Sequence, residues 1–339
     1  LSTSAKEEYR SQNETYVLKK IIPAYKNLAA AIEELKDSGS NKGGLCNYED
    51  GKDYYEYLVR YSTGSSDSIK DLQKQVEQKR KEDLLQLSEL LTKNPILAKE
   101  SESYQLDSSD PSQILAQLKE TIKKDFPEAP DANFTVKYVD EALEDYLSPA
   151  FYLTSPIDDY KENSIYINEG SHYEKMKLFT TLAHEGFPGH LYQNVFANTS
   201  GLPSVRQLLN YSGYTEGWAT YVESYAYDYA AQYLSRENTT QESQRQAASE
   251  AIPSAALTRA AWLNLYASMD MGIHYQGWDA SDVKNFLSDY GISNASAAND
   301  TYEYILGEPA NYLKYYIGYL KFLDLQKYAK KALSENYTD

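Results

Sequence analysis

The sequence predicts a mostly α-helical protein, in which a large helical domain carries a small β-sheet beside a histidine-bearing helix. Most of the chain places apolar residues at spacings of three and four, the period of an amphipathic helix. Two short segments instead alternate apolar and polar residues, or carry β-branched residues between Pro, Asn and Gly, as strands do. Both come shortly before two closely spaced histidines, so the sheet is expected next to that helix.

The first third of the chain is predicted to be helical. Residues 4–36 and 66–100 show long amphipathic patterns with charged residues between the apolar positions. Between them, "DSGSNKGGLCNYEDGKDYYEYLVRY" indicates a Gly-rich loop followed by an aromatic helix. A further helix is predicted at 111–125, because Asp110 can cap it and Pro111 suits its first turn.

The strand-like segments follow Pro127. They are "ANFTVKYVDEAL", which begins at Ala132, and "SIYIN", which begins at Ser164, and we predict one short strand in each. From about residue 172 the helical period returns. The helices predicted there span residues 172–187, 203–233, 239–275, 279–290 and 309–335.

The domain organisation follows from these elements. Residues 1–125 are expected to form an N-terminal helical arm or lid, and residues 126–339 the region that carries the site. At 339 residues the chain could form one large domain or two ordinary ones, and no internal repeat divides it. We expect the two regions to form one continuous domain.

The composition excludes several classes of function. With 50 acidic and 33 basic residues the net charge is −17, which repels phosphate backbones, so no nucleic-acid partner is expected. No apolar run approaches the roughly 18–20 residues of a membrane-spanning helix, so no transmembrane segment is expected. The single cysteine, Cys46, excludes an intramolecular disulfide and a thiolate metal cluster. The 34 tyrosines either pack between helices or line a groove for peptide or carbohydrate.

The stretch "HEGFPGH" places His184 and His190 six residues apart. On an undisturbed helix they would lie about 120° apart around the axis and about 9 Å apart along it, too far to share one zinc ion. Pro188, however, cannot continue a regular helix, and Gly189 can adopt unusual backbone angles. The helix should therefore kink, bulge or end here, and a π-type bulge is one way for both imidazoles to meet one metal.

Three glutamates complete the candidate site. Glu185 follows the first histidine and would point toward the open position of the metal, where it can take a proton from water. Glu216 and Glu223 lie seven residues apart in the apolar segment "YTEGWATYVE", on nearly the same helical face. A buried carboxylate needs a cation, and two histidines with one glutamate form a zinc-binding set. We favour Glu216 as third ligand and Glu223 as support for a ligand histidine. The reverse assignment would leave the chemistry unchanged.

The motifs around these residues resemble a known family. "HEGFPGH", "EGWATYVE", "RAAWLNLYASMDMGIHYQGW" and "YYIGYLKFLDL" are similar, in this order, to the motifs of domain-of-unknown-function family 885, bacterial proteins regarded as zinc peptidases of the glutamate-zincin type. The similarity runs from about residue 146 to about 325. It implies a zincin-like, mostly α fold in which His184, His190 and Glu216 bind zinc and Glu185 is the base.

The same resemblance suggests further site residues. His274, in "MGIHYQGW", and Tyr315, in "LKYYIGY", are candidates to stabilise the oxyanion of a tetrahedral intermediate, supported by their places in the family motifs. Arg259 and Asp270 lie eleven residues apart on one predicted helix, close to three turns, and so on one face. They could form an ion pair that braces the site, which we favour, or Arg259 could hold a substrate carboxylate.

These observations lead to a functional hypothesis: a zinc-dependent metallopeptidase with a peptide substrate, whose backbone could pair with the strand "SIYIN" beside the metal. The alternatives are a metal-dependent hydrolase of another amide or ester, and a metal-free protein that binds peptides or glycans. Family members commonly begin with a secretion or lipoprotein signal, so the resemblance implies an extracytoplasmic location. Because the chain starts at Leu1 without a leader, we expect that its targeting segment has been removed.

Overall fold

The computed structural model describes residues 2–95, 109–129, 131–170, 175–203, 205–209, 211–237 and 242–337. The parts of the predicted helices at 96–100, 172–174, 204, 210 and 239–241 lie outside the described residues. The chain divides into two compact units, Leu1–Lys42 and Gly43–Asp339. Helices that follow Lys42 pack against later helices and belong to the second unit. The boundary between the two units thus lies before residue 125.

The first unit is helical, as predicted for residues 4–36. It consists of α1 (Thr3–Tyr16), one π-helical turn (Val17–Ile21) and α2 (Ile22–Leu35). Pro23 lies in the first turn of α2 and has no N–H to donate to the preceding turn, which accounts for the wider turn before it. None of the residues in these three elements is buried.

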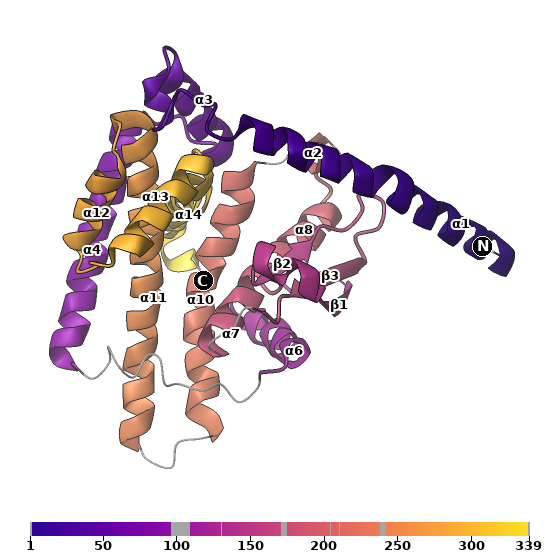
Figure 1. Cartoon of the computed structure of the whole chain (residues 1–339). Helices are drawn as coiled ribbons and strands as arrows, with labels where there is room; N and C mark the ends of the chain where they lie inside the picture. Colours follow the sequence, from indigo (N-terminus) through magenta and orange to yellow (C-terminus); the bar gives the residue numbers. More distant parts are fainter. Residues whose placement is uncertain are drawn as a thin grey trace. The chain divides into compact units, whose positions relative to one another are not determined.

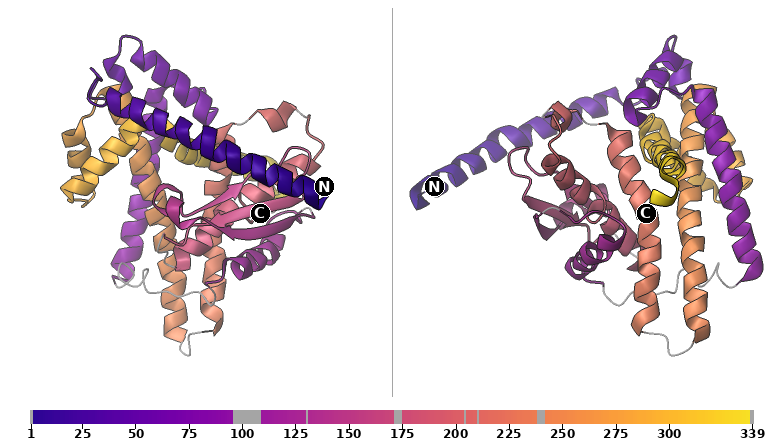
Figure 2. Two further views of the ribbon diagram at one scale, coloured as in Figure 1. Left: turned by 45° about the vertical axis from the view of Figure 1, so that its right-hand side comes forward. Right: turned by 180° about the vertical axis from the view of Figure 1, so that it is seen from behind.

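Long helices dominate the second unit. α4 (Ile69–Lys93) packs against α11 (Glu242–Met271), and α14 (Asn311–Leu333) contacts both α11 and α10 (Ser212–Glu237). α3 (Gly51–Thr63) packs on α14 and α10. Seen from behind in Figure 2, α14 lies between α10 and α11. Within the described ranges, no helix combines the length and the apolar character needed to cross a membrane.

A small sheet and three helices lie on the other side of α10 (Figure 1). α6 (Pro111–Thr121) and α7 (Lys175–Glu185) cover the sheet, and α8 (His190–Thr199) follows α7. The strands are β1 (Asn133–Tyr138), β2 (Ala150–Leu153) and β3 (Glu162–Ile167), in the order β1-β3-β2. β1 is parallel to β3 and β2 is antiparallel to it. The predicted strands are thus β1 and β3, and β2 is an additional edge strand.

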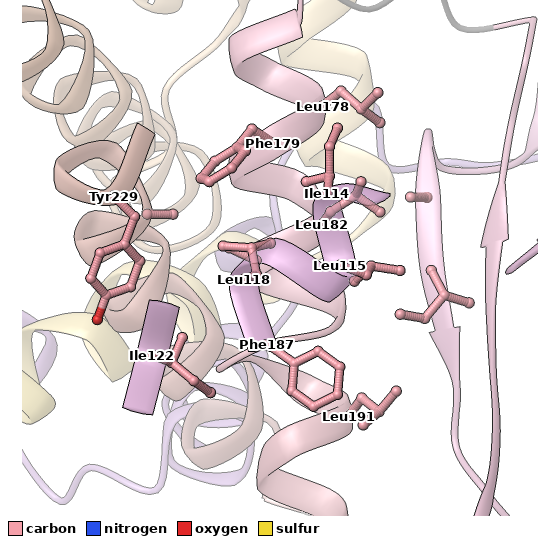
Figure 3. Packing of buried hydrophobic residues seen from close by; sticks show 14 of the residues in the cluster. Ile114, Leu115, Leu118, Ile122, Leu178, Phe179, Leu182, Phe187, Leu191 and Tyr229 are labelled. Carbon is pink, nitrogen blue, oxygen red and sulfur yellow. The ribbon is translucent and has the colours of Figure 1, made fainter. Parts of the chain in front are cut away.

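The core of this region lies between α6, α7 and α10 (Figure 3). Its side chains are spaced three or four residues apart on each helix, so that one face of each is apolar. They include Ile114, Leu115, Leu118, Ile122, Leu178, Phe179, Leu182 and Tyr229. This packing fixes α7, whose last turn carries His184, against both α6 and α10.

The remaining elements are short. α12 (Ala280–Ser288) and α13 (Ala295–Gly307) pack against the end of α11 and the π-helical turn Gly272–Gln276 that follows it. α9 (Val205–Leu208) precedes α10. Short 3-10 turns lie at Leu45–Asn47, Ile122–Lys124, Glu141–Tyr146 and Ser334–Asn336. α13 was not predicted, because its first turns are rich in Ala, Asn and Asp and carry little apolar period.

Two glycines bring α10 and α14 into direct backbone contact. A Cβ atom added to Gly217 would lie 2.5 Å from the Cα of Gly318, and one added to Gly318 would lie 2.3 Å from the carbonyl oxygen of Gly213. These distances are far below van der Waals contact. The helices therefore approach as closely as backbones allow, and the residues next to Gly217 face those next to Gly318.

Replacing Gly318 by alanine is expected to destabilise the protein by about 1–3 kcal/mol, because backbone atoms of α10 must move to admit the methyl group. Urea unfolding monitored by circular dichroism measures this change. Gly307→Ala is the matched control, since a Cβ there meets no atom within 4 Å. Equal unfolding midpoints for the two variants would show that the contact between the helices is not tight.

Candidate metal centre

The chain ends one helix and starts another between the two histidines. α7 ends at Glu185 and α8 begins at His190, so the helix stops here instead of continuing through a π-type bulge. The peptide bond between Phe187 and Pro188 is cis. The N–H of Gly189 donates to the carbonyl of Ala183 (2.9 Å). A Cβ on Gly189 would lie 1.8 Å from the carbonyl oxygen of His184, so only glycine fits.

This break brings His184 and His190 together. Their ring centroids are 4.9 Å apart, with the rings nearly perpendicular at 87°. The Nε2 atoms of His184 and His190 lie 3.6 and 3.3 Å from Oε2 of Glu216. Ligand atoms at about 2.0–2.2 Å from a tetrahedral zinc ion lie roughly 3.3–3.5 Å from one another. One ligand atom from each of the three side chains lies within 4.8 Å of the others, so they fit one ion.

Three consecutive residues of α10 join the site to its surroundings. Glu216 faces the imidazoles, and Gly217 contacts Gly318 of α14. The indole N–H of Trp218 donates to the carbonyl oxygen of Pro188 at 2.9 Å. The segment that carries Glu216 therefore also holds the turn before His190 in place.

Glu223 lies two turns further along α10 and contacts the opposite side of the His184 ring. Its Oε2 is 3.3 Å from Nδ1 of His184, and its Oε1 accepts a hydrogen bond from Nε of Arg259 at 3.0 Å. A carboxylate on the second ring nitrogen orients a ligand histidine and fixes its tautomer. Of the two glutamates considered as third ligand, only Glu216 faces both Nε2 atoms, which favours that assignment.

Glu185 lies beside these side chains at the end of α7. Its Oε2 accepts a hydrogen bond from the backbone N–H of Tyr152, at 2.8 Å. Tyr152 belongs to β2, whose other side pairs with β3. The edge strand thus fixes the direction of the carboxylate, and both residues line the same cavity as His184 and His190.

α14 contributes two more side chains. The ring of Tyr315 lies 6.5 Å from the ring of His184, and Nζ of Lys314 lies 3.9 Å from Oε1 of Glu216. Burial and the nearby carboxylates of Glu216 and Glu185 raise the pKa of the Tyr315 phenol, so it stays a hydrogen-bond donor. Lys314 was not among the predicted site residues. Its signal in the sequence was its place directly before Tyr315.

The carboxylates control the charge of this cluster. Burial lowers the pKa of His184, but hydrogen bonds to Glu216 and Glu223 outweigh it and raise this pKa to about 10. The imidazoles in turn lower the pKa of Glu216 against the effect of burial. Burial also opposes ionisation of Glu223, yet Arg259 and His184 lower its pKa to about 2. Without a metal, His184 is therefore protonated at neutral pH.

The cluster opens into a cavity of about 1550 Å³. Its walls come from β2, α7, α8, α10, α11 and α14. The tyrosines fall into two groups: some are fully buried, such as Tyr55, Tyr229 and Tyr316, while others line the cavity, such as Tyr266, Tyr312 and Tyr315.

His274 and Asp270 are not brought to the cavity. The ring of His274 is 1% exposed, with Nδ1 accepting from the N–H of Leu45 (3.3 Å) and Nε2 lying 3.0 Å from the carbonyl of Ile305. Both nitrogens are occupied by backbone groups, so this side chain is placed to support the fold and not an oxyanion. His274 lies in the π-helical turn Gly272–Gln276, and its ring stacks on that of Tyr55 of α3, with 5.5 Å between the ring centroids, which holds it in this packing.

The favoured ion pair between Arg259 and Asp270 is not formed. Arg259 pairs with Glu223, as described above. Asp270 instead accepts hydrogen bonds from the Tyr55 hydroxyl (2.5 Å) and the Ala310 N–H (3.0 Å), which ties α11 to α3 and to the start of α14. Eleven residues separate the two by about 16 Å along a helix, which exceeds the reach of an arginine side chain to an aspartate.

Comparison with known proteins gives one matching family and several solved structures of similar fold. The family model described as "Bacterial protein of unknown function (DUF885)" matches residues 1–338. The fold is similar to that of a candidate lipoprotein from Colwellia psychrerythraea, with TM-score 0.78 and 22% identity, and of another, of unknown function, from Shewanella oneidensis, with TM-score 0.65 and 16% identity. All of this chain is covered, but only 59% and 63% of those chains. No functionally curated protein matches the sequence.

Metal binding should release a proton. Because His184 is protonated without metal and must be neutral to ligate it, the affinity for Zn²⁺ is expected to rise about tenfold per pH unit between about pH 6 and 8. Calorimetric titration in buffers of different ionisation enthalpy measures the proton count. A pH-independent affinity would contradict the assignment of His184.

Replacing Glu223 by glutamine should weaken zinc binding by about 10–100-fold, because the carboxylate on Nδ1 of His184 is lost while all three ligand atoms remain. Competition with a chromophoric chelator measures the affinity. Glu89→Gln, on the exposed surface of α4, is the control and should leave it unchanged. A loss as complete as that of Glu216→Ala would instead make Glu223 a ligand.

Proposed function

We propose that this chain, which belongs to the bacterial protein family of unknown function DUF885, is a zinc-dependent metallopeptidase. The observation that carries the proposal is the convergence of three ligand atoms, from His184, His190 and Glu216, which lie within 4.8 Å of one another. Glu185 lines the same cavity and is free of an ion pair with any described residue. Two histidines, one glutamate and a neighbouring carboxylate base match the donor set of a catalytic zinc site.

The residues present fit Zn²⁺ better than a hard cation. Two imidazoles and one carboxylate are borderline ligands that suit zinc, whereas Ca²⁺ and Mg²⁺ take oxygen ligands. When bound, Zn²⁺ polarises the scissile carbonyl and lowers the pKa of a coordinated water. Three protein ligands would leave a fourth coordination position for water or substrate, and all three side chains line the cavity.

The side chains around the ligands supply the proton transfers and the charge stabilisation. Glu185, held by the N–H of Tyr152, takes a proton from the attacking water and returns it to the leaving amine. Tyr315 keeps its phenolic proton and can donate a hydrogen bond to the developing oxyanion. Lys314 adds a positive charge beside Glu216. In this proposal, Tyr315 of α14 stabilises the oxyanion, and His274 takes no part in the reaction.

The shape of the cavity favours a peptide over a small amide or ester. Its volume of about 1550 Å³ exceeds the roughly 300–1,000 Å³ of a typical small-molecule site. One of its walls is the edge strand β2, whose residues Ala150 and Tyr152 line the cavity. An extended peptide can pair with such an edge. The sequence led us to expect this role for "SIYIN", but that strand cannot take it, because β3 is paired on both sides.

We also propose an extracytoplasmic location. Two proteins with this fold are described as candidate lipoproteins, and both are longer than this chain. The proposed ligands are two imidazoles and a carboxylate, without a cysteine, so the site would not depend on a reducing compartment.

Replacing Glu185 by glutamine should lower kcat by about 10²–10⁴-fold and leave bound zinc unchanged, because the base is lost but no ligand is removed. Digestion of a peptide library, followed by mass spectrometry, compares this variant with the wild type, and elemental analysis gives the zinc content. His184→Ala is the companion variant and should lose both zinc and activity. Equal cleavage by the wild type and Glu185→Gln would remove the glutamate from the mechanism.

A further inference from the structure

Arg259 lines the cavity and carries hydrogen-bond donors beyond the one that Glu223 accepts. Its Nε donates to Glu223 at 3.0 Å, and among the described residues this is its one hydrogen-bond partner. A guanidinium has five N–H donors, so the two terminal nitrogens keep theirs. Of the Arg259 side chain, 43% is exposed, against 8% for Glu223, and it lines the cavity. An arginine needed only to neutralise Glu223 would not have to present its donors to the cavity.

Arg259 lies close to the proposed metal ligands. One carboxylate separates them: Glu223 contacts Arg259 at 3.0 Å and His184 at 3.3 Å. The guanidinium therefore lies within a few residues of extended chain, at about 3.3–3.6 Å each, of His184. A planar guanidinium matches a carboxylate through two parallel hydrogen bonds.

Aromatic side chains surround this end of the cavity. Trp262 and Tyr266 follow Arg259 at helical spacing on α11, and Tyr266 stacks on Tyr312 of α14 at 4.7 Å between ring centroids. All three line the cavity. Tyr312 lies one turn before Tyr315, so the aromatic wall continues toward the metal ligands. Such a wall accepts an apolar or aromatic side chain next to the group bound by Arg259.

The structure assigns to Arg259 the recognition of the free C-terminal carboxylate of the substrate. We infer that the enzyme removes one or two residues from the C-terminus of peptides whose last residue is apolar or aromatic. The inference rests on the peptidase function proposed above and gives that site a substrate class. Lys314 is less suited, because it lies beside Glu216 itself, within 3.9 Å of a ligand carboxylate.

The test uses the zinc-loaded full chain and two peptides of one sequence ending in phenylalanine, one with a free carboxylate and one with a C-terminal amide. Wild type is expected to release one or two C-terminal residues from the acid, with kcat/KM about 10–100-fold above that for the amide. In Arg259→Gln the ratio of acid to amide should fall close to one. Arg206→Gln removes an exposed cavity cation on α9 and should keep the wild-type ratio.

Two results would overturn the assignment. If Arg259→Gln reduces cleavage of both peptides equally, the arginine acts only through Glu223. If wild type cuts both peptides equally and at internal bonds, the carboxylate is not recognised. Arg259→Lys adds a readout that a bracing role would not give: it keeps the charge but loses the bidentate geometry, so the ratio should be intermediate.

Measurements of peptide binding distinguish a failure of this inference from a failure of the proposed function. Calorimetric titration of zinc-loaded Glu185→Gln with the same two peptides should show about 10–100-fold tighter binding of the acid, a preference that Arg259→Gln in that background removes. Carboxylate-dependent binding without cleavage by wild type would refute the peptidase but keep the carboxylate site. Cleavage without any carboxylate preference would refute the site but keep the peptidase.

Discussion

The negative charge of Glu216 is the constraint on which the arrangement of the surrounding helices depends. Its side chain is only 19% exposed, and a carboxylate in such a place is stable only beside cations or hydrogen-bond donors. His184 from α7 and His190 from α8 face it, and Lys314 approaches it from α14. For these groups to meet, one helix must stop after His184, another must start at His190, and α10 must touch α14 backbone to backbone. Each of these features has a local cause in the sequence, in a Pro-Gly pair and in two facing glycines.

Local causes are what the sequence allowed us to predict. Pro188 and Gly189 indicated that the helix could not run on, and the seven-residue spacing of Glu216 and Glu223 placed both carboxylates on one face of α10. The imidazoles meet the carboxylates as these patterns suggested. The manner of the break was not predicted, because both a bulge and a complete stop satisfy a proline at that position, and neighbours distant in sequence decide between them. Trp218, which donates to the carbonyl of Pro188, is one such neighbour.

Non-local partners could not be derived in the same way. Periodicity reports which face of a helix a residue occupies, but not which helix packs on that face or at what height. Arg259 and Asp270 share a face and yet bind partners on different helices, α10 for the first and α3 for the second. His274 is held by Leu45, 229 residues away. Strand order is equally non-local: β3 has the stronger strand pattern and is central, whereas the short β2 forms the edge next to the site.

The protonated imidazole of His184 affects the order in which the protein can fold and bind a metal. Between Glu216 and Glu223, this proton adds a positive charge to those of Lys314 and Arg259, so both carboxylates have cationic partners without a metal ion. Under the proposed function, folding and metal binding would then be separate events, because the side chains are already arranged before an ion binds. Such a protein could fold in one place and become active in another, where the supply of metal would decide when it does so.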